Sequence, residues 1–373
     1  MSNVYQRLRE QLNRYAFGYP EAASGVEIDL LKLMFTEEEA SMFTQLSAQS
    51  ETAANVAVRL GKPVADIASR LADMADKGLL FRERQGDSIK YSAIPFIHGL
   101  LEFQVTRLGR PLVKLTGQYI NEVYKDNMAQ GMRAFIRTVP VQEAVAAPNE
   151  VAPYDDARQV LIDADLIVIT ECACRQQKDL FGKACSKPRE VCFMFGPMGQ
   201  YYIDNGLGRK IDRKEALQIL DRAHEAGCIT QMAAARYPFS MCNCCVCCCG
   251  FLKAVSKHEK PAELVSSNYK IDFNRNNCIG CGICVERCGM GAAVLNSSDG
   301  LSEQNSDRCI GCGLCVTTCP TKSRQLVPKA GDPQAPPADT RSMFVALAKK
   351  RGIDVLDPQD TISFGFPADE SDN

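Results

Sequence analysis

Cysteine restricts what this chain can fold into more than any other residue. The 373 residues include 19 cysteines, and none of them precedes Cys172. The first residues contain no apolar stretch typical of a signal peptide, and no run approaches the ~18 apolar residues that a membrane span needs. We therefore expect a cytoplasmic protein in a reducing compartment, where disulfides are disfavoured. An odd number of cysteines cannot pair completely within one chain, so thiols packed this densely indicate metal or iron–sulfur ligands.

Eight of the cysteines form an internal repeat. Residues 278–288 read CIGCGICVERC, and residues 309–319 read CIGCGLCVTTC before Pro320. Three cysteines spaced in this way let a tight loop surround three corners of one iron–sulfur cube, and the glycines between them allow positive φ. The repeat therefore predicts two [4Fe–4S] clusters. The alternative is a pair of zinc ribbons, which the glycines and the C-x3-C-P ending disfavour.

This repeat resembles bacterial two-cluster ferredoxins over about residues 268–328. The resemblance implies a ferredoxin-like domain in which the fourth cysteine of each run binds the cluster of the other run. It implies two ligand sets: Cys278, Cys281, Cys284 and Cys319 for one cluster, and Cys309, Cys312, Cys315 and Cys288 for the other. The sequence departs from the family at Gly289, where proline is usual, so we expect a more flexible loop and a shifted reduction potential there.

The other eleven cysteines lie between Cys172 and Cys249. Six of them fall within the run MCNCCVCCCG, a density beyond any packing need that would invite oxidation without a metal. Adjacent cysteines point in different directions, so one cube cannot take all six. We expect one or two further iron–sulfur clusters, as two cubanes or as one cluster of higher nuclearity. Zinc–thiolate binding is a third choice.

We assign the ligands of this segment to two groups. The first comprises Cys172, Cys174, Cys185 and Cys192, and the second comprises Cys242, Cys244, Cys245 and either Cys247 or Cys248. Cys228 and Cys249 are expected to be non-ligands. Basic residues around the first group either offset thiolate charge or form a solvated loop: Arg175, Lys178, Lys183, Lys187 and Arg189. The histidines His98, His224 and His258 are expected to be surface or capping residues.

The N-terminal part shows helical patterns followed by a hairpin pattern. A capping residue at Thr36, followed by acidic first-turn residues, opens one helix, Gly61 ends the next, and Pro63 opens a third that stops at Gly78. Two short strand patterns then flank the turn Gln85-Gly86-Asp87. This order of elements resembles winged helix-turn-helix domains over about residues 36–97.

We expect an α+β multidomain chain with a winged-helix domain, a cysteine-rich α/β iron–sulfur domain and a ferredoxin-like two-cluster domain. The expected divisions are an N-terminal helix with the winged helix (1–97), a helical connector and linker (98–154), the cysteine-rich domain (155–262), the ferredoxin domain (263–330), and a proline-rich linker with a C-terminal tail (331–373). The whole order is also similar to that of uncharacterised 4Fe-4S binding proteins of anaerobes, a resemblance that implies no activity.

The function expected from these features is electron transport between redox partner proteins, with the ferredoxin module and the central clusters forming a path. No nucleotide, flavin or acid–base site is recognisable, so an electron-transfer protein or an oxidoreductase subunit is expected over a stand-alone enzyme. Two alternatives remain: a reductase or activase with substrate at a central cluster, and a redox-sensing DNA-binding regulator. A homodimer is a further alternative for how this chain assembles.

DNA binding through the winged helix is expected to be absent. The net charge of −2 gives no support to general polyanion binding. The expected recognition helix carries Asp66, Asp73 and Asp76 against Arg70 and Lys77. DNA-reading helices usually present basic or amide groups instead. The hairpin residues that could still touch phosphates are Arg82, Arg84 and Lys90.

Overall fold

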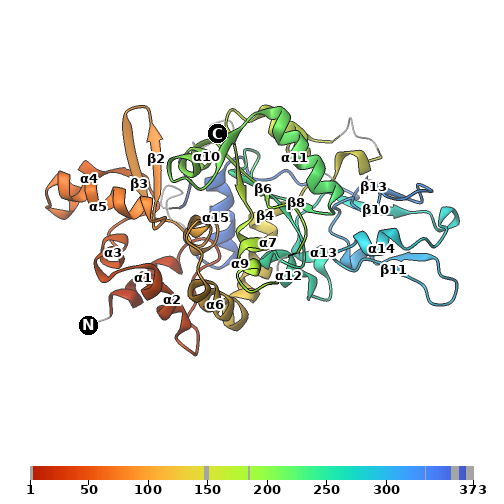
Figure 1. Ribbon diagram of the computed structural model, residues 1–373, viewed down its shortest axis with the longest axis horizontal. Coiled ribbons are helices and arrows are strands. Elements are labelled where there is room, and N and C mark those ends of the chain that lie inside the picture. Colours follow the sequence, from red (N-terminus) through yellow and green to blue (C-terminus); the bar gives the residue numbers. More distant parts are fainter. Residues whose placement is uncertain (1–2, 147–150, 184, 332, 354–360, 367–373) are drawn as a thin grey trace.

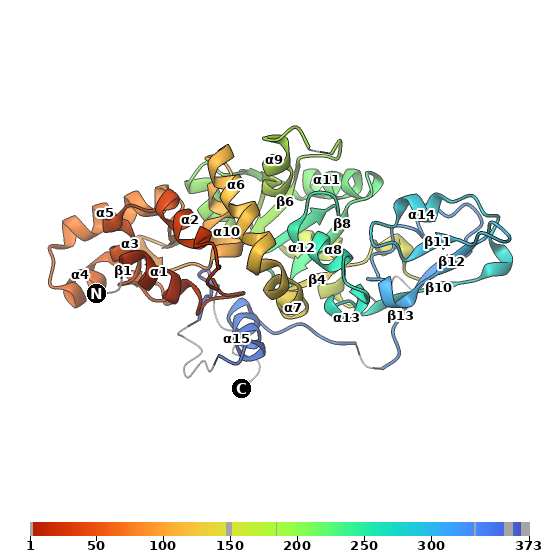
Figure 2. The same ribbon diagram turned by 90° about the horizontal axis from the view of Figure 1, so that it is seen from below.

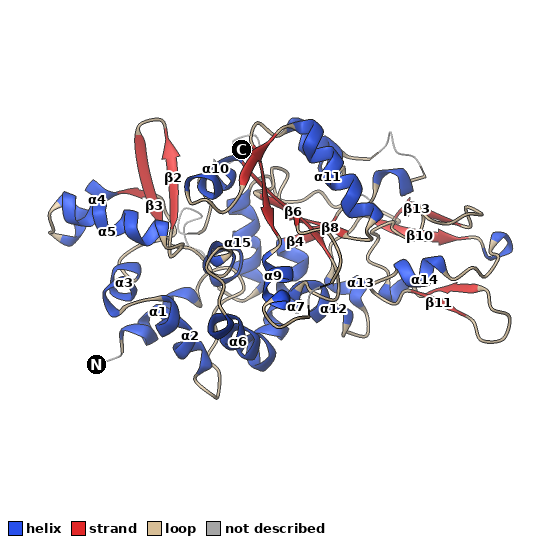
Figure 3. Ribbon diagram, in the orientation of Figure 1, coloured by secondary structure: helices blue, strands red, loops and turns tan. Residues whose placement is uncertain are grey.

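A computed structural model describes residues 3–146, 151–183, 185–331, 333–353 and 361–366. Three regions follow one another along the long axis of the molecule (Figure 1). Helices and a hairpin stand at one end, a larger sheet with flanking helices lies in the middle, and the cysteine repeat lies at the other end. Helices and strands are mixed throughout (Figure 3), which confirms the expected combination of helix and sheet.

The N-terminal region begins with helices and continues into a small antiparallel sheet of order β1-β3-β2. Its elements are α1 (Val4–Leu12), α2 (Val26–Met34), α3 (Glu37–Phe43), β1 (Glu51–Thr52), α4 (Ala53–Leu60), α5 (Val64–Asp76), β2 (Phe81–Gln85) and β3 (Ser88–Ser92). The expected capping role of Thr36 is confirmed, because its hydroxyl accepts from Glu39 N, and the Glu39 side chain completes a capping box. Gly61 ends α4 with φ 62°. The expected order of helices and hairpin is therefore found between Thr36 and Ser92.

The hairpin and α5 pack on the middle region. The Tyr201 hydroxyl of α10 (Gly196–Asp204) donates to the carbonyl oxygens of Ala75 and Leu80, at 3.1 and 3.2 Å. The rings of Phe81 and Tyr201 lie 5.2 Å apart. The N-terminal region is thereby fixed against the larger sheet.

The segment expected as a connector contributes to the larger sheet. Its elements are η1 (Phe96–Leu100), η2 (Glu102–Gln104), α6 (Arg110–Tyr119), η3 (Ile120–Tyr124), α7 (Lys125–Phe135), β4 (Ile136–Thr138), η4 (Gln142–Ala144) and η6 (Pro153–Asp155). β4 pairs antiparallel with β8, a strand from beyond residue 154. Strand pairing thus crosses the expected domain boundary at residue 154. That boundary stays a prediction.

The larger sheet has six strands in the order β4-β8-β9-β6-β5-β7, and all neighbours are antiparallel. The strands after β4 are β5 (Ile167–Glu171), β6 (Glu190–Phe195), β7 (Arg209–Ile211), β8 (Ile229–Ala233) and β9 (Ser240–Cys244). The helices of this region, besides α10, are α8 (Ala157–Asp163), α9 (Ala173–Asp179), α11 (Arg213–Glu225), α12 (Gly250–Ser256) and α13 (Pro261–Leu264). Asp212 caps α11 by accepting from Glu215 N at 2.8 Å.

The C-terminal region repeats a short unit around each cysteine run. Two hairpin-like pairs, β10–β13 and β11–β12, flank the runs. The elements are β10 (Tyr269–Phe273), η7 (Arg275–Asn277), α14 (Ile283–Arg287), β11 (Ala293–Leu295), β12 (Ser302–Gln304), η8 (Ser306–Arg308) and β13 (Arg324–Pro328). Asn274 and Asn305 cap η7 and η8 in the same way, so the sequence repeat is also a structural one.

After β13 the chain returns to the middle of the molecule, where α15 (Thr340–Lys350) lies beside α7 (Figure 2). Phe344 of α15 packs on Phe135 with ring centroids 5.6 Å apart. Parts of the expected tail, residues 354–360 and 367–373, lie outside the described residues. Among the described helices, none combines the length and apolar character that crossing a membrane requires.

Candidate metal centres

The two cysteine runs adopt the loop geometry that their glycines predict. Gly280, Gly282, Gly311 and Gly313 all have positive φ, between 69° and 79°. At Gly311 a Cβ atom would also lie 2.4 Å from the carbonyl oxygen of Tyr269, so no other residue fits there. The expectation that these glycines shape the loops is confirmed.

The second run meets the last cysteine of the first run. Cys288, Cys309, Cys312 and Cys315 line one small cavity of about 20 Å³. Ala292 N donates to Cys288 Sγ at 3.2 Å. Burial raises the pKa of the Cys315 thiol to about 12, so a bound metal is what would keep it deprotonated. Four thiols around one cavity, with a backbone donor aimed at one sulfur, fit a [4Fe–4S] cluster.

The cysteines expected to bind the other cluster are linked through Ser302. Ser302 N donates to Cys278 Sγ at 3.4 Å, and the Ser302 hydroxyl lies 3.3 Å from Cys284 Sγ. Cys319 lies 3.2 Å from the Ser323 hydroxyl. Burial would raise the pKa of Cys319, but hydrogen bonds from Ser323 and Thr321 outweigh it and bring the pKa to about 7. Cys281 is exposed at the tip of its loop.

The run of cysteines at 242–249 is divided by the geometry of β9 and the turn that follows it. Side chains alternate along a strand, so Cys242 and Cys244 lie on one face and Cys245 starts on the other. The turn closes through the bond from Cys249 N to Cys245 O, at 2.9 Å, and α12 then begins at Gly250. One run of sequence thereby supplies thiols to two places.

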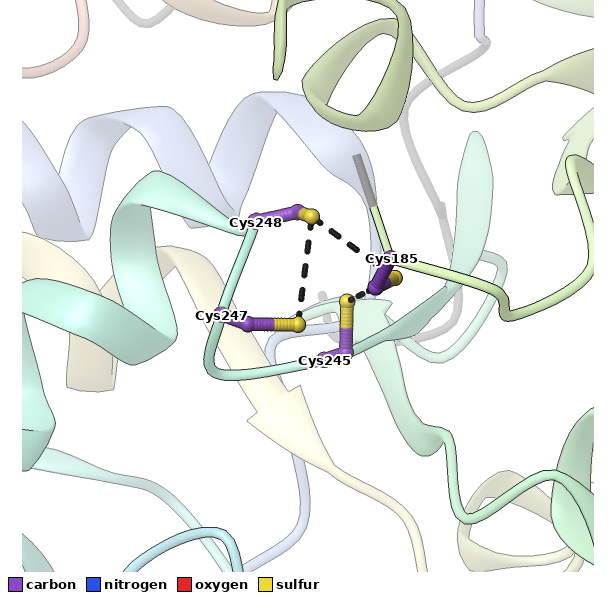
Figure 4. A group of neighbouring side chains, drawn as sticks. All are labelled: Cys185, Cys245, Cys247 and Cys248. Atoms are coloured by element: carbon purple, nitrogen blue, oxygen red, sulfur yellow. Dashed lines mark hydrogen bonds between the residues drawn. The ribbon is translucent and has the colours of Figure 1, made fainter. Parts of the chain in front are cut away.

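The first of these places is the four-thiol group: Cys185, Cys245, Cys247 and Cys248. All four Sγ atoms lie within 4.8 Å of one another. Figure 4 shows Cys185 reaching toward the turn, with Sγ distances of 3.7 Å to both Cys245 and Cys248. Burial would raise the pKa of Cys185, but hydrogen bonds from Lys187 N and the neighbouring thiols lower it to about 7.

The spacing of the four-thiol group decides which metals suit it. A Zn–S bond of about 2.3 Å gives tetrahedral sulfur–sulfur edges of about 3.8 Å, close to those found here. A cubane places a separate iron behind each thiolate and therefore needs the thiols further apart. Cys247 is exposed and Cys185 stands in a loop, so both can move outward. The group accepts either a single ion as it stands or a cubane after a small expansion.

The second place is a ring of six thiols, here called the six-thiol ring: Cys172, Cys174, Cys249, Cys244, Cys242 and Cys192, in order around it. Neighbouring thiols in this order shift each other's pKa, Cys192 closes the ring on Cys172, and all six line one cavity. Backbone register supports the arrangement, since Cys192 of β6 lies directly opposite Cys242 of β9. Cys172, Cys192, Cys244 and Cys249 are each less than a tenth exposed.

Arg175 lies between the two sets of thiols. It is 1% exposed and donates to Pro188 O at 2.6 Å, Asn243 O at 3.0 Å and Cys228 Sγ at 3.3 Å. Burial lowers its pKa, but the charges of Cys172, Cys228 and Cys245 raise it by more, so the guanidinium stays charged. Within the described residues its Nε finds no acceptor. A buried cation with a spare donor suits anionic thiolate-bound metal centres on either side.

The ligand groups expected from sequence are arranged differently in the structure. Cys185 lies with Cys245, away from the thiols of Cys172, Cys174 and Cys192. Cys249, expected to be a non-ligand, lies in the six-thiol ring. Cys228 belongs to neither group and contacts Arg175. Strand register and one turn decide this partition, and neither is visible in local spacing.

A cavity of about 460 Å³ opens above the six-thiol ring, and all six ring thiols line it. Cys248 of the four-thiol group also reaches its wall. The other lining residues include hydrophobic side chains such as Ile97 and Leu101, and the basic residues Lys125, Lys178, Lys253 and Lys257. Glu102, Asp126 and Glu171 line it too, so the cavity combines a thiol floor with apolar walls and charged residues of both signs.

Two residues of this cavity were not expected to have a role. His98 has φ 55°, an unusual conformation for a non-glycine residue, and its ring packs 5.0 Å from that of Phe135. Glu102 accepts from Gly99 N at 3.2 Å, and burial raises the pKa of its carboxyl. His258 lines the cavity too, so two of the three histidines expected at the surface lie at this site. Their position follows from packing of distant segments, for which the sequence carries no local signal.

Comparison with known proteins places the repeat in a family. Residues 270–320 match the 4Fe-4S dicluster domain. No curated protein and no solved structure matches the chain. The family match and the four-thiol group together support one conclusion: this chain is an iron–sulfur protein that carries a 4Fe-4S dicluster domain near its C-terminal end.

Proposed function

We propose that this protein carries single electrons between redox partners, and that its dicluster domain exchanges them with a third iron–sulfur centre at the four-thiol group. The observation that carries the proposal is the contact between Gly289 and Val246. Val246 stands between Cys245 and Cys247, and Gly289 follows Cys288. Electron tunnelling weakens steeply with distance, so two centres separated by touching residues can exchange electrons rapidly.

Further contacts hold the dicluster domain at this position. Arg287 donates to His224 O at 2.9 Å and to Glu225 O at 2.7 Å. Arg308 donates to Ser256 O at 2.8 Å, and Val141 N donates to Cys312 O at 3.1 Å. Hydrogen bonds from a charged guanidinium are stronger than neutral ones. These contacts fix the distance between the dicluster domain and the four-thiol group, which supports electron transfer between them within one chain.

The N-terminal region serves this proposal as a docking element, and its winged-helix character is part of the proposal. Arg82 pairs with Asp76 at 2.7 Å and donates to Asn205 at 3.0 Å, while Arg84 pairs with Asp204. The hairpin arginines are therefore engaged within the chain. Asp66 and Asp73 of α5 are exposed. An acidic helix face beside neutralised arginines favours docking to protein over binding to DNA.

A second candidate function is reduction of a small molecule, because the six-thiol ring faces a cavity of about 460 Å³. A pure electron carrier does not need such a space beside a metal centre. Glu102 lines the same cavity, and burial raises the pKa of its carboxyl, so it is a candidate proton donor to a ligand there. In this version, the dicluster domain and the four-thiol group supply electrons to the cavity.

The test is a comparison of full-length protein reconstituted anaerobically with iron and sulfide. The variant Cys245→Ser/Cys247→Ser should lose about four irons while the dicluster domain keeps its own eight or so. Electrons delivered to the dicluster domain should then no longer reach the central region in rapid-mixing absorbance measurements. Cys228→Ser, which removes a buried thiol outside both groups, is the matched control. An unchanged iron content, or one zinc at this group in place of iron, would refute the relay.

A further inference from the structure

We propose that the six-thiol ring is a metal centre of its own, which holds a single iron–sulfur cluster with more than four irons at the floor of the cavity. The family match ends at residue 320 and begins at residue 270, so it includes none of these thiols. The four-thiol group is also separate from them. The centre is therefore additional to those of the dicluster domain and of the proposed relay.

The backbone positions the six thiols without reference to any metal. β5, β6 and β9 are consecutive in the sheet, and Cys192 lies opposite Cys242 across β6 and β9. Thr170 of β5 lies opposite Cys192, and Cys172 follows two residues later after an irregularity in the pairing. Cys192 and Cys242 thus lie side by side on adjacent strands, and Cys172 lies just beyond the end of β5, where its N–H donates to Arg189 O at 2.9 Å.

The remaining thiols complete the ring from three other positions. Cys244 stands two residues beyond Cys242, on the same face of β9. Cys174 lies in the first turn of α9, and Cys249 is the residue that precedes α12. Each belongs to a different element, and all of them converge on one cavity wall. The fold therefore brings six thiols together from two strands, the starts of two helices and the end of a third strand. Such convergence indicates a binding site.

The number of thiols determines the size of the cluster. One cubane takes four thiolates, and two separate cubanes take eight. Six thiols in a closed ring are too many for the first and too few for the second. A single cubane would leave two buried thiols next to an oxidisable metal site, with no partner of their own. One cluster of higher nuclearity, bound by all six, leaves none.

Charge supports metal occupancy of the whole ring. The ring residues are buried or half-buried, and six thiolates held this close together would repel one another, so a cluster bound by all six needs positive charge nearby. Arg175 interacts electrostatically with Cys172, and four lysines line the cavity together with three acidic residues. These cations cannot neutralise six thiolates alone. Iron ions within the ring supply the rest of the positive charge.

The cavity gives this centre a function beyond relay. Cys248 of the four-thiol group lines the same cavity as the ring, so the two groups are neighbours. Delivery of electrons to the ring rests on the proposed relay, whereas the metal content of the ring does not. With apolar walls and charged residues of both signs around it, the exposed side of the cluster would accept a small ligand.

The experiment counts iron, acid-labile sulfide and zinc in four full-length proteins reconstituted anaerobically. They are the unchanged chain, Cys192→Ser/Cys242→Ser in the ring, Cys245→Ser/Cys247→Ser in the four-thiol group, and Cys228→Ser as control. We expect the ring variant to hold fewer irons than the unchanged chain by more than about four, the content of one cubane. The four-thiol variant tests the relay separately, since its iron loss is independent of the ring.

Mössbauer spectra of the unchanged chain provide the second measurement, which needs no variant to fold. We expect iron signals in the unchanged chain that cubanes alone do not account for. A loss of four irons or fewer, spectra of cubanes only, or two zinc ions bound by the six thiols would each overturn the proposal. Alkylation of the ring thiols in the native protein would do so as well.

Discussion

Gly289 and Val246 touch so closely that a Cβ atom on Gly289 would lie 2.7 Å from Cγ2 of Val246. Gly289 is not among the glycines with positive φ, so the position needs space and not an unusual backbone. This contact explains why the sequence departs from the ferredoxin pattern after Cys288. A proline there would place its ring against the turn that carries the central cysteines. The departure marks the junction of two cysteine regions, where a flexible loop was expected.

The replacement Gly289→Ala should therefore disturb this junction. Overpacking typically costs about 1–3 kcal/mol, and electron transfer between the dicluster domain and the central region should slow. Val246→Ala in the same protein should restore the rate, because the Val246 Cβ lies 3.5 Å from the added atom, an ordinary contact. Gly117→Ala in α6, where nothing lies within 4 Å, is the control. Rapid-mixing absorbance measures all four proteins, and equal rates throughout would contradict the junction's role.

The crossed arrangement of ligands in the dicluster domain makes a prediction about double variants. Cys288→Ser and Cys312→Ser should each remove about four irons, and the double variant should lose no more than either one, because both ligands serve one cluster. Cys278→Ser combined with Cys288→Ser should remove both clusters. Mutations at one shared site are non-additive, whereas those at separate sites add. Iron analysis decides this, and an additive loss in Cys288→Ser/Cys312→Ser would show that the two cysteines bind different clusters.

The hairpin should not bind DNA. Arg82 and Arg84 already pair with acidic groups of the chain, and Lys90 donates to Gln85 at 2.7 Å. Fluorescence anisotropy with duplex DNA at physiological salt should show no binding, in both oxidised and reduced protein. Arg84→Ala should leave this result unchanged. Sequence-selective binding that responds to cluster oxidation would instead favour a regulator.

His224 should make stability depend on pH. Burial lowers its pKa from 6.5 to about 4, and its ring hydrogen-bonds the Thr230 hydroxyl at 2.8 Å. Between those pH values the unfolded chain binds a proton that the folded chain does not, so stability is full above about pH 6.5 and is lost as pH falls toward 4. The loss from pH 7.5 to 5.5 should be about 1 kcal/mol.

Urea unfolding of the reconstituted protein at both pH values measures this loss. His224→Gln retains a hydrogen-bonding side chain but cannot gain a charge, so its acid loss should be smaller by that amount. Cys228→Ser, which leaves His224 in place, should keep the loss of the unchanged chain. An identical pH response in His224→Gln would mean that His224 is already accessible to protons in the folded state.

Several elements follow from local sequence alone. Thr36, Gly61 and the turn at Gly86 mark the bounds of α3, α4 and the hairpin, because capping and positive φ depend on a few consecutive residues. The dicluster loops follow in the same way from their glycines and spacing. Each of these features depends on no more than about ten consecutive residues, so the local sequence is sufficient to predict it.

The tertiary structure decided the partition of the central cysteines and the sheet that produces it. β4 pairs with β8 across almost a hundred residues, and Cys192 meets Cys242 only because β6 and β9 are neighbours. Pairing between distant strands depends on the packing of the whole sheet and leaves no mark in local spacing. The amino-acid sequence alone determined that this chain binds iron–sulfur clusters through its repeat. Which of the remaining thiols meet, and which cavity they face, was decided by strand register, because register sets the face on which each side chain lies.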